Sequence, residues 1–233
     1  MSKDFSFKQF VVAHDRCAMK VGTDGVLLGA WAHLNGAKHI LDIGCGSGLI
    51  ALMAAQRTPD ATVWGIDIDA PSVEQAQENA LASPFAGRVH IAWQDILTYS
   101  PLLSFDHILC NPPFYTEQTL PPEEARMRAR HTAGLSLEAL LERVSAIVAP
   151  KGLFSLILPT QTAHAFVTHA LSCGWFVARE CHVYTVAHKP PKRILLTLSR
   201  SNPCTAGKEE LVLQGDDGKR SEAYSSLCSD FYL

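Results

Sequence analysis

The chain has 233 residues, 47% of them hydrophobic and 18% charged, with a formal net charge of -3. A chain of this length and composition can bury one substantial core, and its slight negative charge excludes a protein that wraps nucleic acid indiscriminately. No apolar run approaches the roughly 18 residues that a membrane helix needs, and the mixed start Met1–Phe7 is unlike a cleavable leader, so a cytoplasmic protein without membrane contact is expected.

Apolar runs separated by helix-favouring stretches predict the order of the secondary structure. Thr23 or Asp24 is placed to cap a first helix, which would reach Leu34 and end at the Asn35-Gly36 pair. Strands and helices then alternate, which is typical of an α/β fold with a parallel sheet and right-handed crossovers. The expected elements after the first helix are a strand at 39–43, a helix at 48–57, a strand at 62–67, a helix at 71–82, strands at 89–94 and 105–110, a helix at 136–148, a strand at 153–158 and a helix at 161–172.

The last part of the chain predicts how the sheet is completed. Residues 181–186 and 193–199 are expected to form a closing hairpin around the turn Lys189–Pro191. Residues 201–207 are typical of a linker to a short carboxyl tail, in which 215–218 would form a hairpin turn. The expected parts are an N-terminal extension at 1–36, the main α/β domain at 37–200, and a C-terminal linker and tail at 201–233.

Glycines follow the first predicted strand at alternate positions, Gly44, Gly46 and Gly48, and a helix is expected directly after them. Such glycines let the backbone turn tightly and approach a ligand, and the first amides of the helix can donate to a polar or anionic group. The stretch from Gly46 to Ala51 also satisfies the loose dinucleotide pattern G-x-G-x-x-G/A. The glycine loop alone therefore leaves a nicotinamide cofactor open.

Carboxylates stand at the first three strand ends. Asp42 precedes the glycines and can meet a cationic amino group or orient the loop, Asp67 ends the second strand and can accept both hydroxyls of a ribose, and Asp95 follows the third strand, where it can accept from an adenine amine. An acid at the second strand end also suits NAD, whereas the acid at the third does not follow from a dinucleotide site. For each carboxylate, a solvated loop acid or a helix N-cap is the alternative.

The fourth strand runs into Asn111-Pro112-Pro113-Phe114, a combination that suits methylation of a planar amino group. Asn offers a side-chain carbonyl, the prolines fix φ and remove backbone donors so that a main-chain carbonyl is left free to accept, and the Phe ring gives a flat face for a base. The alternative is a proline-rich turn that merely closes a strand. Four successive strand ends with compatible chemistry favour a site.

With these residues in place, the chain resembles the seven-stranded S-adenosylmethionine-dependent methyltransferases, and within them the amino methyltransferases that carry Asn-Pro-Pro-Phe or Asn-Pro-Pro-Tyr. The segments Gln9-Phe10 and His14–Trp31 are similar to the amino-terminal block of the bacterial tRNA1(Val) adenine-N6 methyltransferases. The resemblance implies a Rossmann-like seven-stranded sheet, mostly parallel with an antiparallel last strand. It also implies methyl transfer to N6 of the adenine immediately 3′ of the anticodon of tRNA1(Val).

The resemblance further implies the roles of individual residues. Asn111, Pro112, Pro113 and Phe114 would be catalytic: the Asn111 side chain and the Pro112 carbonyl would hold the two N–H groups, and Phe114 would stack on the base. The same machinery could act on guanine N2 in RNA, DNA adenine or protein glutamine, and a nicotinamide enzyme or a binding protein of the same fold remains the more distant alternative. The residues expected to bind S-adenosylmethionine are Lys20, Thr23, Asp42, Gly44, Gly46, Gly48, Asp67, Ile68, Asp95, Ile96 and Asn111.

Scattered charges and cysteines complete the expectations. Seven cysteines without a C-x-x-C pair argue against disulfides and zinc, so no metal is expected, and the partner would be tRNA bound by a monomer. The segment Tyr115–Leu135 is expected to be a substrate-facing loop that is less ordered without RNA. Three basic segments could together attract phosphates around the site. Their residues are Lys3, Lys8, Arg16 and Lys20 with Phe5, Phe7 and Phe10; Arg126, Arg128, Arg130 and His131; and His188, Lys189, Lys192 and Arg193.

Overall fold

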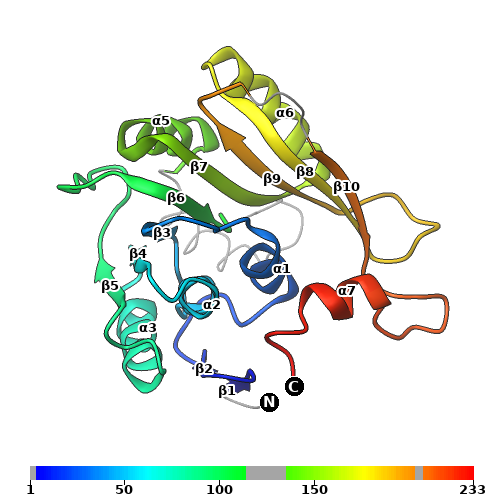
Figure 1. The fold of residues 1–233 in the computed structure, drawn as a ribbon, viewed down its shortest axis with the longest axis horizontal. Coiled ribbons are helices and arrows are strands. Elements are labelled where there is room, and N and C mark those ends of the chain that lie inside the picture. The colour runs from blue at the N-terminus through cyan, green and yellow to red at the C-terminus, as the bar shows by residue number, and fades with distance from the viewer. Residues whose placement is uncertain (1–3, 114–134, 203–206) are drawn as a thin grey trace, which may run out of the picture.

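The computed structural model describes residues 4–113, 135–202 and 207–233. Its centre is an eight-stranded sheet in the order β10-β8-β9-β7-β6-β3-β4-β5 (Figure 1). Only β9 runs antiparallel to its neighbours β7 and β8, and every other neighbouring pair is parallel. The strands are β3 (His39–Ile43), β4 (Thr62–Asp67), β5 (Val89–Trp93), β6 (Phe105–Cys110), β7 (Val148–Pro159), β8 (Phe176–Tyr184), β9 (Arg193–Ser199) and β10 (Gly207–Val212).

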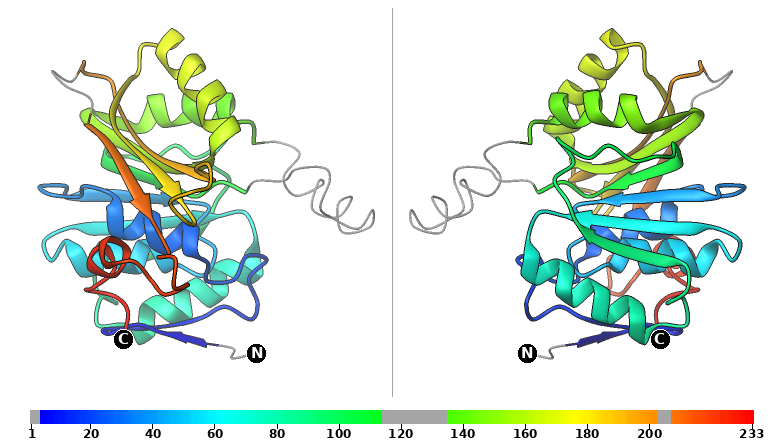
Figure 2. Two further views of the ribbon diagram at one scale, coloured as in Figure 1. Left: turned by 90° about the vertical axis from the view of Figure 1, so that its right-hand side faces the viewer. Right: turned by 90° about the vertical axis from the view of Figure 1, so that its left-hand side faces the viewer.

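Helices cover both faces of this sheet, so that the sheet lies between two helical layers (Figure 2). Residues of α1, α2 and the carboxyl-terminal tail share one core cluster, and residues of α5 and α6 belong to the other. Successive residues of the central strand β6 serve the two cores in turn, since Leu109 lies in the first and Ile108 in the second. The helices are α1 (Thr23–Trp31), α2 (Leu49–Arg57), α3 (Ala70–Ala82), α5 (Leu137–Ile147), α6 (Thr160–Ser172) and α7 (Glu222–Leu227).

The amino-terminal segment folds back onto the carboxyl terminus. It forms a small antiparallel sheet of β1 (Asp4–Ser6) and β2 (Val11–Ala13), strands too short to be recognised from sequence. Between them, Phe7 and Phe10 are buried and stack with ring centroids 4.8 Å apart, and Phe7 also stacks on Tyr232. These aromatic side chains therefore hold the two ends of the chain together, and Phe7 and Phe10 are not part of an exposed rim.

The alternating strands and helices from 39 to 172 are confirmed, with small shifts at their ends. The antiparallel pairing of 193–199 is also confirmed, and its partner β8 begins five residues earlier than expected, at Phe176. The expected number of seven strands is wrong, because β10 adds an eighth beside β8 from within the segment expected as linker and tail. Glu209 fixes this edge strand: it accepts from Trp31 Nε1 at 3.0 Å and from Arg179 Nε at 2.8 Å.

Long apolar helices and clusters of metal-ligating side chains are both absent from the described ranges. None of the helices in 4–113, 135–202 and 207–233 has the length and apolar character to cross a bilayer. Over the same ranges, no three His, Cys, Asp or Glu side chains gather where they could hold a metal ion.

Candidate functional site

The carboxyl ends of β3, β4, β5 and β6 lie side by side. In the ladder, Ile43 is paired with Cys110 and Asp67 with Trp93, so the residues that follow these strands meet at one edge. In open α/β sheets ligands bind outside this edge. The structure thus gathers the glycine loop, the carboxylates and the Asn-Pro-Pro motif, which are up to about seventy residues apart in sequence, as the sequence predicted.

The glycine loop between β3 and α2 is open toward this edge. Gly44, Gly46 and Gly48 have φ angles of +67°, +52° and +81°, which residues with a side chain rarely adopt. A Cβ added at Gly44 or Gly46 would meet no atom of the described residues within 4 Å, so these residues leave space above the loop. The loop is pinned from below, because Gly46 N donates to Asp67 Oδ2 at 2.8 Å and Gly44 N to Ile66 O at 2.9 Å.

Asp42 lies beneath the loop and is fully buried. Its Oδ2 accepts from the Ala51 amide in α2 at 3.1 Å, whereas its Oδ1 has no hydrogen-bond partner among the described residues. Burial raises the pKa of this carboxyl well above its usual range, and the nearby Asp67 adds to the shift. One oxygen therefore holds the helix α2 that follows the loop, and the other remains available to a donor. The expected roles of Asp42 toward the loop or a cationic amino group stay predictions.

Asn111 presents the second unpartnered oxygen. Its Oδ1 is buried and has no hydrogen-bond partner in the described part of the chain. A buried acceptor without a partner costs roughly 1–3 kcal/mol, so one that persists calls for a ligand or a water. Asn111 follows β6 and Gly44 follows the paired strand β3, so the two residues continue neighbouring strands at this edge.

Asp67 and two apolar neighbours form the next part of the edge. Asp67 accepts from the Gly46 and Asp69 amides, and burial raises its pKa while these hydrogen bonds oppose the shift. Beside it, the exposed Trp93 donates from Nε1 to Ile68 O at 2.8 Å, and both side chains are open to solvent. Trp93 was missed from sequence, although an aromatic residue at the end of a strand, two residues before an acid, could have indicated it.

The third strand end carries Asp95 and Ile96. Asp95 is exposed, and its Oδ1 accepts from the Leu97 amide at 2.9 Å, so the side chain first stabilises its own turn. Ile96 is buried in the second core cluster, and only its backbone can face a ligand. The carboxylate of Asp95 has further lone pairs that can accept from an amine, so the expected contact to adenine stays a prediction. Asp95 lies after β5, at the opposite end from Asn111 in the series of strand ends β6, β3, β4 and β5.

Lys20 and Thr23 lie at the start of α1. Lys20 is exposed, and Thr23 faces a cavity shared with the carboxyl-terminal tail. The expectation that Thr23 or Asp24 caps α1 is wrong: the N-cap is Gly22, which makes no side-chain hydrogen bond, and Asp24 pairs with Arg193 at 2.8 Å. The start of α1 packs against the start of α2, since a Cβ added at Gly25 would lie 3.1 Å from Leu49. The role of Lys20 and Thr23 in cofactor binding stays a prediction.

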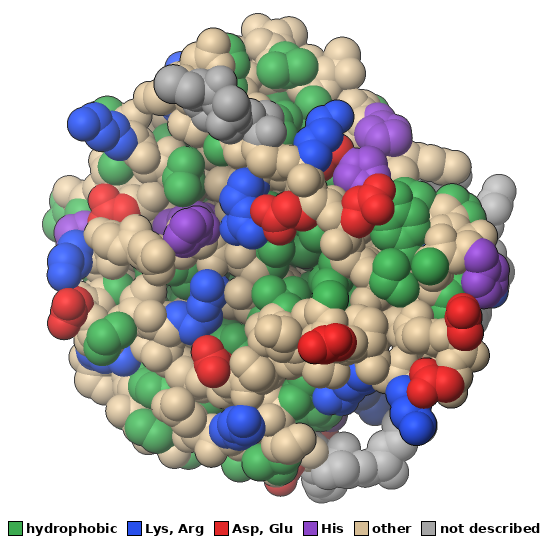
Figure 3. All heavy atoms as spheres, turned by 45° about the vertical axis from the view of Figure 1, so that its right-hand side comes forward, with side chains coloured by type: hydrophobic (Ala, Val, Ile, Leu, Met, Phe, Trp, Pro, Cys, Tyr) green, Lys and Arg blue, Asp and Glu red, His purple; other side chains and the backbone are tan. Residues whose placement is uncertain are grey.

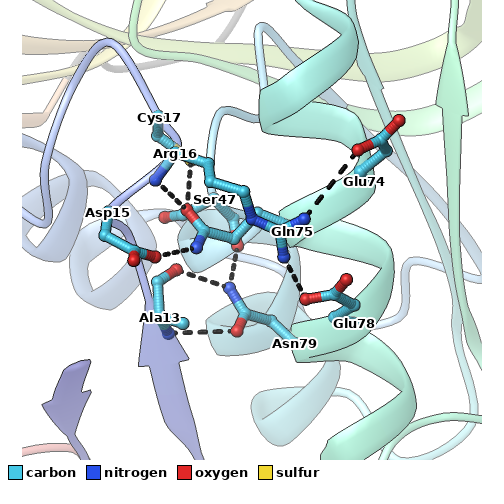
Figure 4. A network of polar contacts seen from close by, with 9 residues as sticks. All are labelled: Ala13, Asp15, Arg16, Cys17, Ser47, Glu74, Gln75, Glu78 and Asn79. Atoms are coloured by element: carbon cyan, nitrogen blue, oxygen red, sulfur yellow. Dashed lines mark hydrogen bonds and ion pairs between the residues drawn. The ribbon is translucent and has the colours of Figure 1, made fainter. Parts of the chain in front are cut away.

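Two polar residues of α3 clamp the amino-terminal segment onto the site (Figure 4). Asn79 donates to Ala13 O at 2.8 Å and to Ser47 O at 2.9 Å, and it accepts from the Ala13 amide at 3.0 Å. One buried amide thus joins the end of β2 to the glycine loop. Sequence reasoning missed this residue, although a polar side chain on the buried face of a helix was a signal.

Gln75 repeats this arrangement one turn earlier in α3. It accepts from the Arg16 amide at 3.0 Å and donates to Asp15 at 2.6 Å (Figure 4). The Arg16 guanidinium is in turn paired with Glu74 and Glu78. The charge of Arg16 is therefore compensated within the protein, which removes it from the expected basic rim.

A cavity of about 420 Å³ lies next to the Asn-Pro-Pro motif. It is bounded by the residues after β6, the junction of β7 with α6, the start of α5 and the turn before β9, and it is largely apolar. Its size suits one planar group. The lining residues are Pro112, Pro113, Leu135, Leu137, Leu140, Pro159, Thr160, Gln161, Thr162, Pro191 and Lys192.

Several expected site residues lie outside the described residues. They include Phe114, the loop 115–134 and the basic residues at 126, 128, 130 and 131. The described donor set nevertheless fits S-adenosylmethionine: two buried oxygens without partners, on Asp42 and Asn111, flank an open glycine loop. A carboxylate at the next strand end and exposed apolar side chains beyond it would suit a ribose and an adenine ring.

Known proteins share both the sequence and the fold. The Methyltransferase small domain family matches residues 20–130. The chain is 44% identical to a tRNA1(Val) (adenine(37)-N6)-methyltransferase from Enterobacter sp. (strain 638), over 98% of this chain and 94% of the relative. It is 43% identical to a protein of the same name from Bacteroides thetaiotaomicron, over 98% of this chain and 97% of the relative.

A solved structure supports the fold independently. A protein described as a predicted O-methyltransferase from Agrobacterium tumefaciens superposes with a TM-score of 0.67 at 20% identity, covering 89% of this chain and 96% of that one. At that identity the likeness concerns the architecture alone. The two relatives match nearly the whole length, and the chain therefore belongs to the family of tRNA1(Val) (adenine(37)-N6)-methyltransferases.

Proposed function

We propose that this protein transfers the methyl group of S-adenosylmethionine to the exocyclic N6 amine of adenine 37 in tRNA1(Val), the reaction named for its relatives. The observation that carries the proposal is the buried Asn111 Oδ1, which has no partner among the described residues; Asn111 continues the strand next to the one that leads into the open glycine loop. An acceptor in that position suits an N–H group of the substrate. A cofactor site and an amine-binding group would thus meet at one edge of the sheet.

The chemistry of the amine explains why two acceptors are needed. The lone pair of adenine N6 is delocalised into the ring, which makes this nitrogen a weak nucleophile. Asn111 Oδ1 would accept one N–H and the Pro112 carbonyl the other, which favours a more pyramidal nitrogen with its lone pair directed at the methyl group. The cofactor supplies an electrophilic methyl on a positively charged sulfur. Transfer forms the N–C bond as the C–S bond breaks, and the proton then passes from nitrogen to solvent.

The residues under the glycine loop would hold the cofactor. Asp42 Oδ1 is the only one of its two oxygens without a partner in the described residues, so it would accept from a donor of the ligand. Asp67 would receive ribose hydroxyls while it keeps the Gly46 amide. The cavity behind Pro112 and Pro113 would accept the base, and Phe114 would stack on it.

The direct test is mass spectrometry of nucleosides from tRNA1(Val) incubated with the protein and labelled S-adenosylmethionine. We expect labelled N6-methyladenosine at position 37, and none when that adenine is replaced by guanine. Parallel reactions with ribosomal RNA, DNA and protein examine the other acceptors of the same chemistry. Label in one of these, with none in tRNA, would contradict the proposal.

The proposal includes the state and place in which the enzyme works. We propose that the enzyme is a monomer, because the groups needed for transfer all come from one chain. We also propose that it acts on tRNA in the cytoplasm and uses no metal. Light scattering of the protein during size-exclusion chromatography, with and without tRNA, tests the monomer. A stable dimer whose disruption abolishes methylation would contradict it.

A further inference from the structure

A second cavity, of about 570 Å³, lies where the two chain ends meet α1. It is bounded by the first residues of α1, the ends of β8 and β10, the start of β9 and the helix α7; we name it the tail cavity. Its volume falls within the roughly 300–1,000 Å³ of small-ligand sites. Of its lining residues, Lys192 also borders the cavity proposed for the target base, and Thr23 is among the residues expected to bind the cofactor. The proposed methyl-transfer step gives Arg220, Tyr224 and Tyr232 no role.

The walls of the tail cavity carry excess positive charge. Lys192, Arg193 and Arg220 line it, and Asp24 is the acid among its lining residues. Asp24 forms a 2.8 Å ion pair with Arg193, so these two charges compensate each other. Within the described ranges, neither Lys192 nor Arg220 forms an ion pair, so two cations remain for an anionic ligand.

Aromatic side chains lie beside these cations. The Arg220 guanidinium is 4.0 Å from the centroid of the Tyr232 ring, and Tyr232 shares a 3.0 Å hydrogen bond with the Tyr224 hydroxyl. Tyr224 is itself buried, so the tail is packed into the core and does not need to order on binding. A guanidinium held this close to a ring offers a planar, charged group of the kind that stacks on nucleobases.

The tail cavity adjoins the cavity behind the Asn-Pro-Pro motif. Lys192 lines both, and the parallel strands β8 and β10 end at the same edge of the sheet as β6. Lys and Arg side chains on the face that carries β10 and α7 are interspersed with Asp and Glu (Figure 3). The attraction for an anion is therefore local to the cavity and not spread over a broad basic patch.

We propose that the tail cavity binds one nucleotide of the tRNA other than the methylated adenine, with its phosphate on Lys192 and Arg220 and its base beside the Arg220 guanidinium. This inference rests on the proposed function. It gives the carboxyl-terminal tail a role in holding the RNA while the target base occupies the neighbouring cavity. A ligand of this kind explains two cations without acidic partners beside stacked aromatic rings.

The experiment measures affinity for tRNA1(Val) across a series of salt concentrations, without cofactor, for Lys192→Gln and Arg220→Gln. We expect each variant to bind about 3- to 10-fold more weakly at low salt and to lower the slope of log K against log salt by roughly 0.7 to 1, as for one lost phosphate contact. The control is Lys38→Gln, the same charge change at the opposite edge of the sheet, where Lys38 pairs with Asp60 at 3.6 Å. Its affinity and slope should equal those of the wild type.

The outcomes separate this inference from the proposed function. Wild-type protein that neither binds nor methylates tRNA contradicts both. If the wild type methylates tRNA while Lys192→Gln and Arg220→Gln bind tRNA as tightly and with the same salt slope, only the role of the tail cavity is overturned. A loss of tRNA affinity in Lys38→Gln equal to that in the two cavity variants would overturn it as well. Unchanged affinity for S-adenosylhomocysteine shows that a variant is folded. Arg220→Lys should keep the salt slope and lose part of the affinity for tRNA, because lysine keeps the positive charge but lacks the planar guanidinium.

Discussion

Buried polar groups in and directly after strand β6 differ in whether the protein itself satisfies their hydrogen bonds. On β6, His107 shares a 2.8 Å hydrogen bond with Ser155 on β7, which shares one of 2.7 Å with Thr197 on β9. All three side chains are buried and satisfied within the protein. Asn111, directly after the same strand β6, has a buried oxygen without a partner in the described chain, as does Asp42 on β3.

The difference shows which buried polar groups stabilise the fold and which serve a ligand. The His107 chain links three adjacent strands and leaves nothing for another molecule. The oxygens of Asn111 and Asp42 weaken the free protein, because each was removed from water without a new hydrogen bond. Polar groups that cost stability at the carboxyl edge of the sheet are those expected to act in binding and catalysis.

The largest effect should follow from Asn111→Ala. We expect kcat for tRNA methylation to fall by about 10²- to 10³-fold, since one acceptor for the reacting amine is lost. Affinity for S-adenosylhomocysteine should change much less, and stability should not fall. Steady-state kinetics and calorimetry measure the three quantities. The matched control is Asn79→Ala, which removes an amide with satisfied hydrogen bonds and should lower stability; equal turnover in Asn111→Ala and wild type would contradict the assigned role.

The next effect concerns pH and His107. Burial lowers its pKa to about 3 in the folded protein, whereas an unfolded histidine titrates near 6.5. The unfolded state therefore binds more protons between these values, and stability is lost as the pH falls below about 6.5. From pH 7 to pH 5 the wild type should lose about 2 kcal/mol more free energy of unfolding than His107→Gln.

Urea unfolding of both proteins at the two pH values measures this difference. The raised pKa of Asp42 acts in the opposite direction, because its folded form holds a proton longer, but it is common to wild type and variant and cancels. Parallel losses in the two proteins would show that His107 does not remain neutral in the fold. His107→Gln should keep its affinity for S-adenosylhomocysteine.

A smaller effect distinguishes two glycines of similar conformation. Gly44 and Gly174 have φ angles of +67° and +75°, and a Cβ at either would meet no atom of the described residues within 4 Å. Replacement by Ala should therefore cost each about 1 kcal/mol in stability through backbone strain. Only Gly44→Ala should also weaken cofactor binding, since its methyl group would enter the space above the loop. Thermal unfolding and calorimetry test the pair, and equal cofactor affinity in both would contradict the position of the site.

The smallest effect is expected at the surface of the amino-terminal clamp. Arg16 pairs with Glu74 and Glu78, and all three side chains are substantially exposed. Exposed ion pairs contribute about 0–1 kcal/mol, so Arg16→Gln should lower the free energy of unfolding by less than 1 kcal/mol, and less at high salt. Affinity for tRNA should remain unchanged, because this charge is already paired. A marked loss of tRNA affinity would return Arg16 to the RNA-binding rim.

Much of the fold and part of the site could be predicted from the sequence. The period of apolar residues determines strands and helices locally, which is why the alternation from 39 to 172 was recovered. The eighth strand was not predicted, because β10 is a polar edge strand. Its Glu209 is held by hydrogen bonds from Trp31 and Arg179, which are distant in sequence.

The sequence by itself determined which chemistry stands at the end of each strand, since an acid, a glycine loop or Asn-Pro-Pro is written in consecutive residues. Only the tertiary structure decided which of these groups are free to act. Asp24 is paired with Arg193, and Arg16 with Glu78. Asp42 and Asn111, in contrast, each have an oxygen without a partner among the described residues. The physical reason is that hydrogen-bond satisfaction depends on what packs nearby in space, and spacing along the chain does not contain that information.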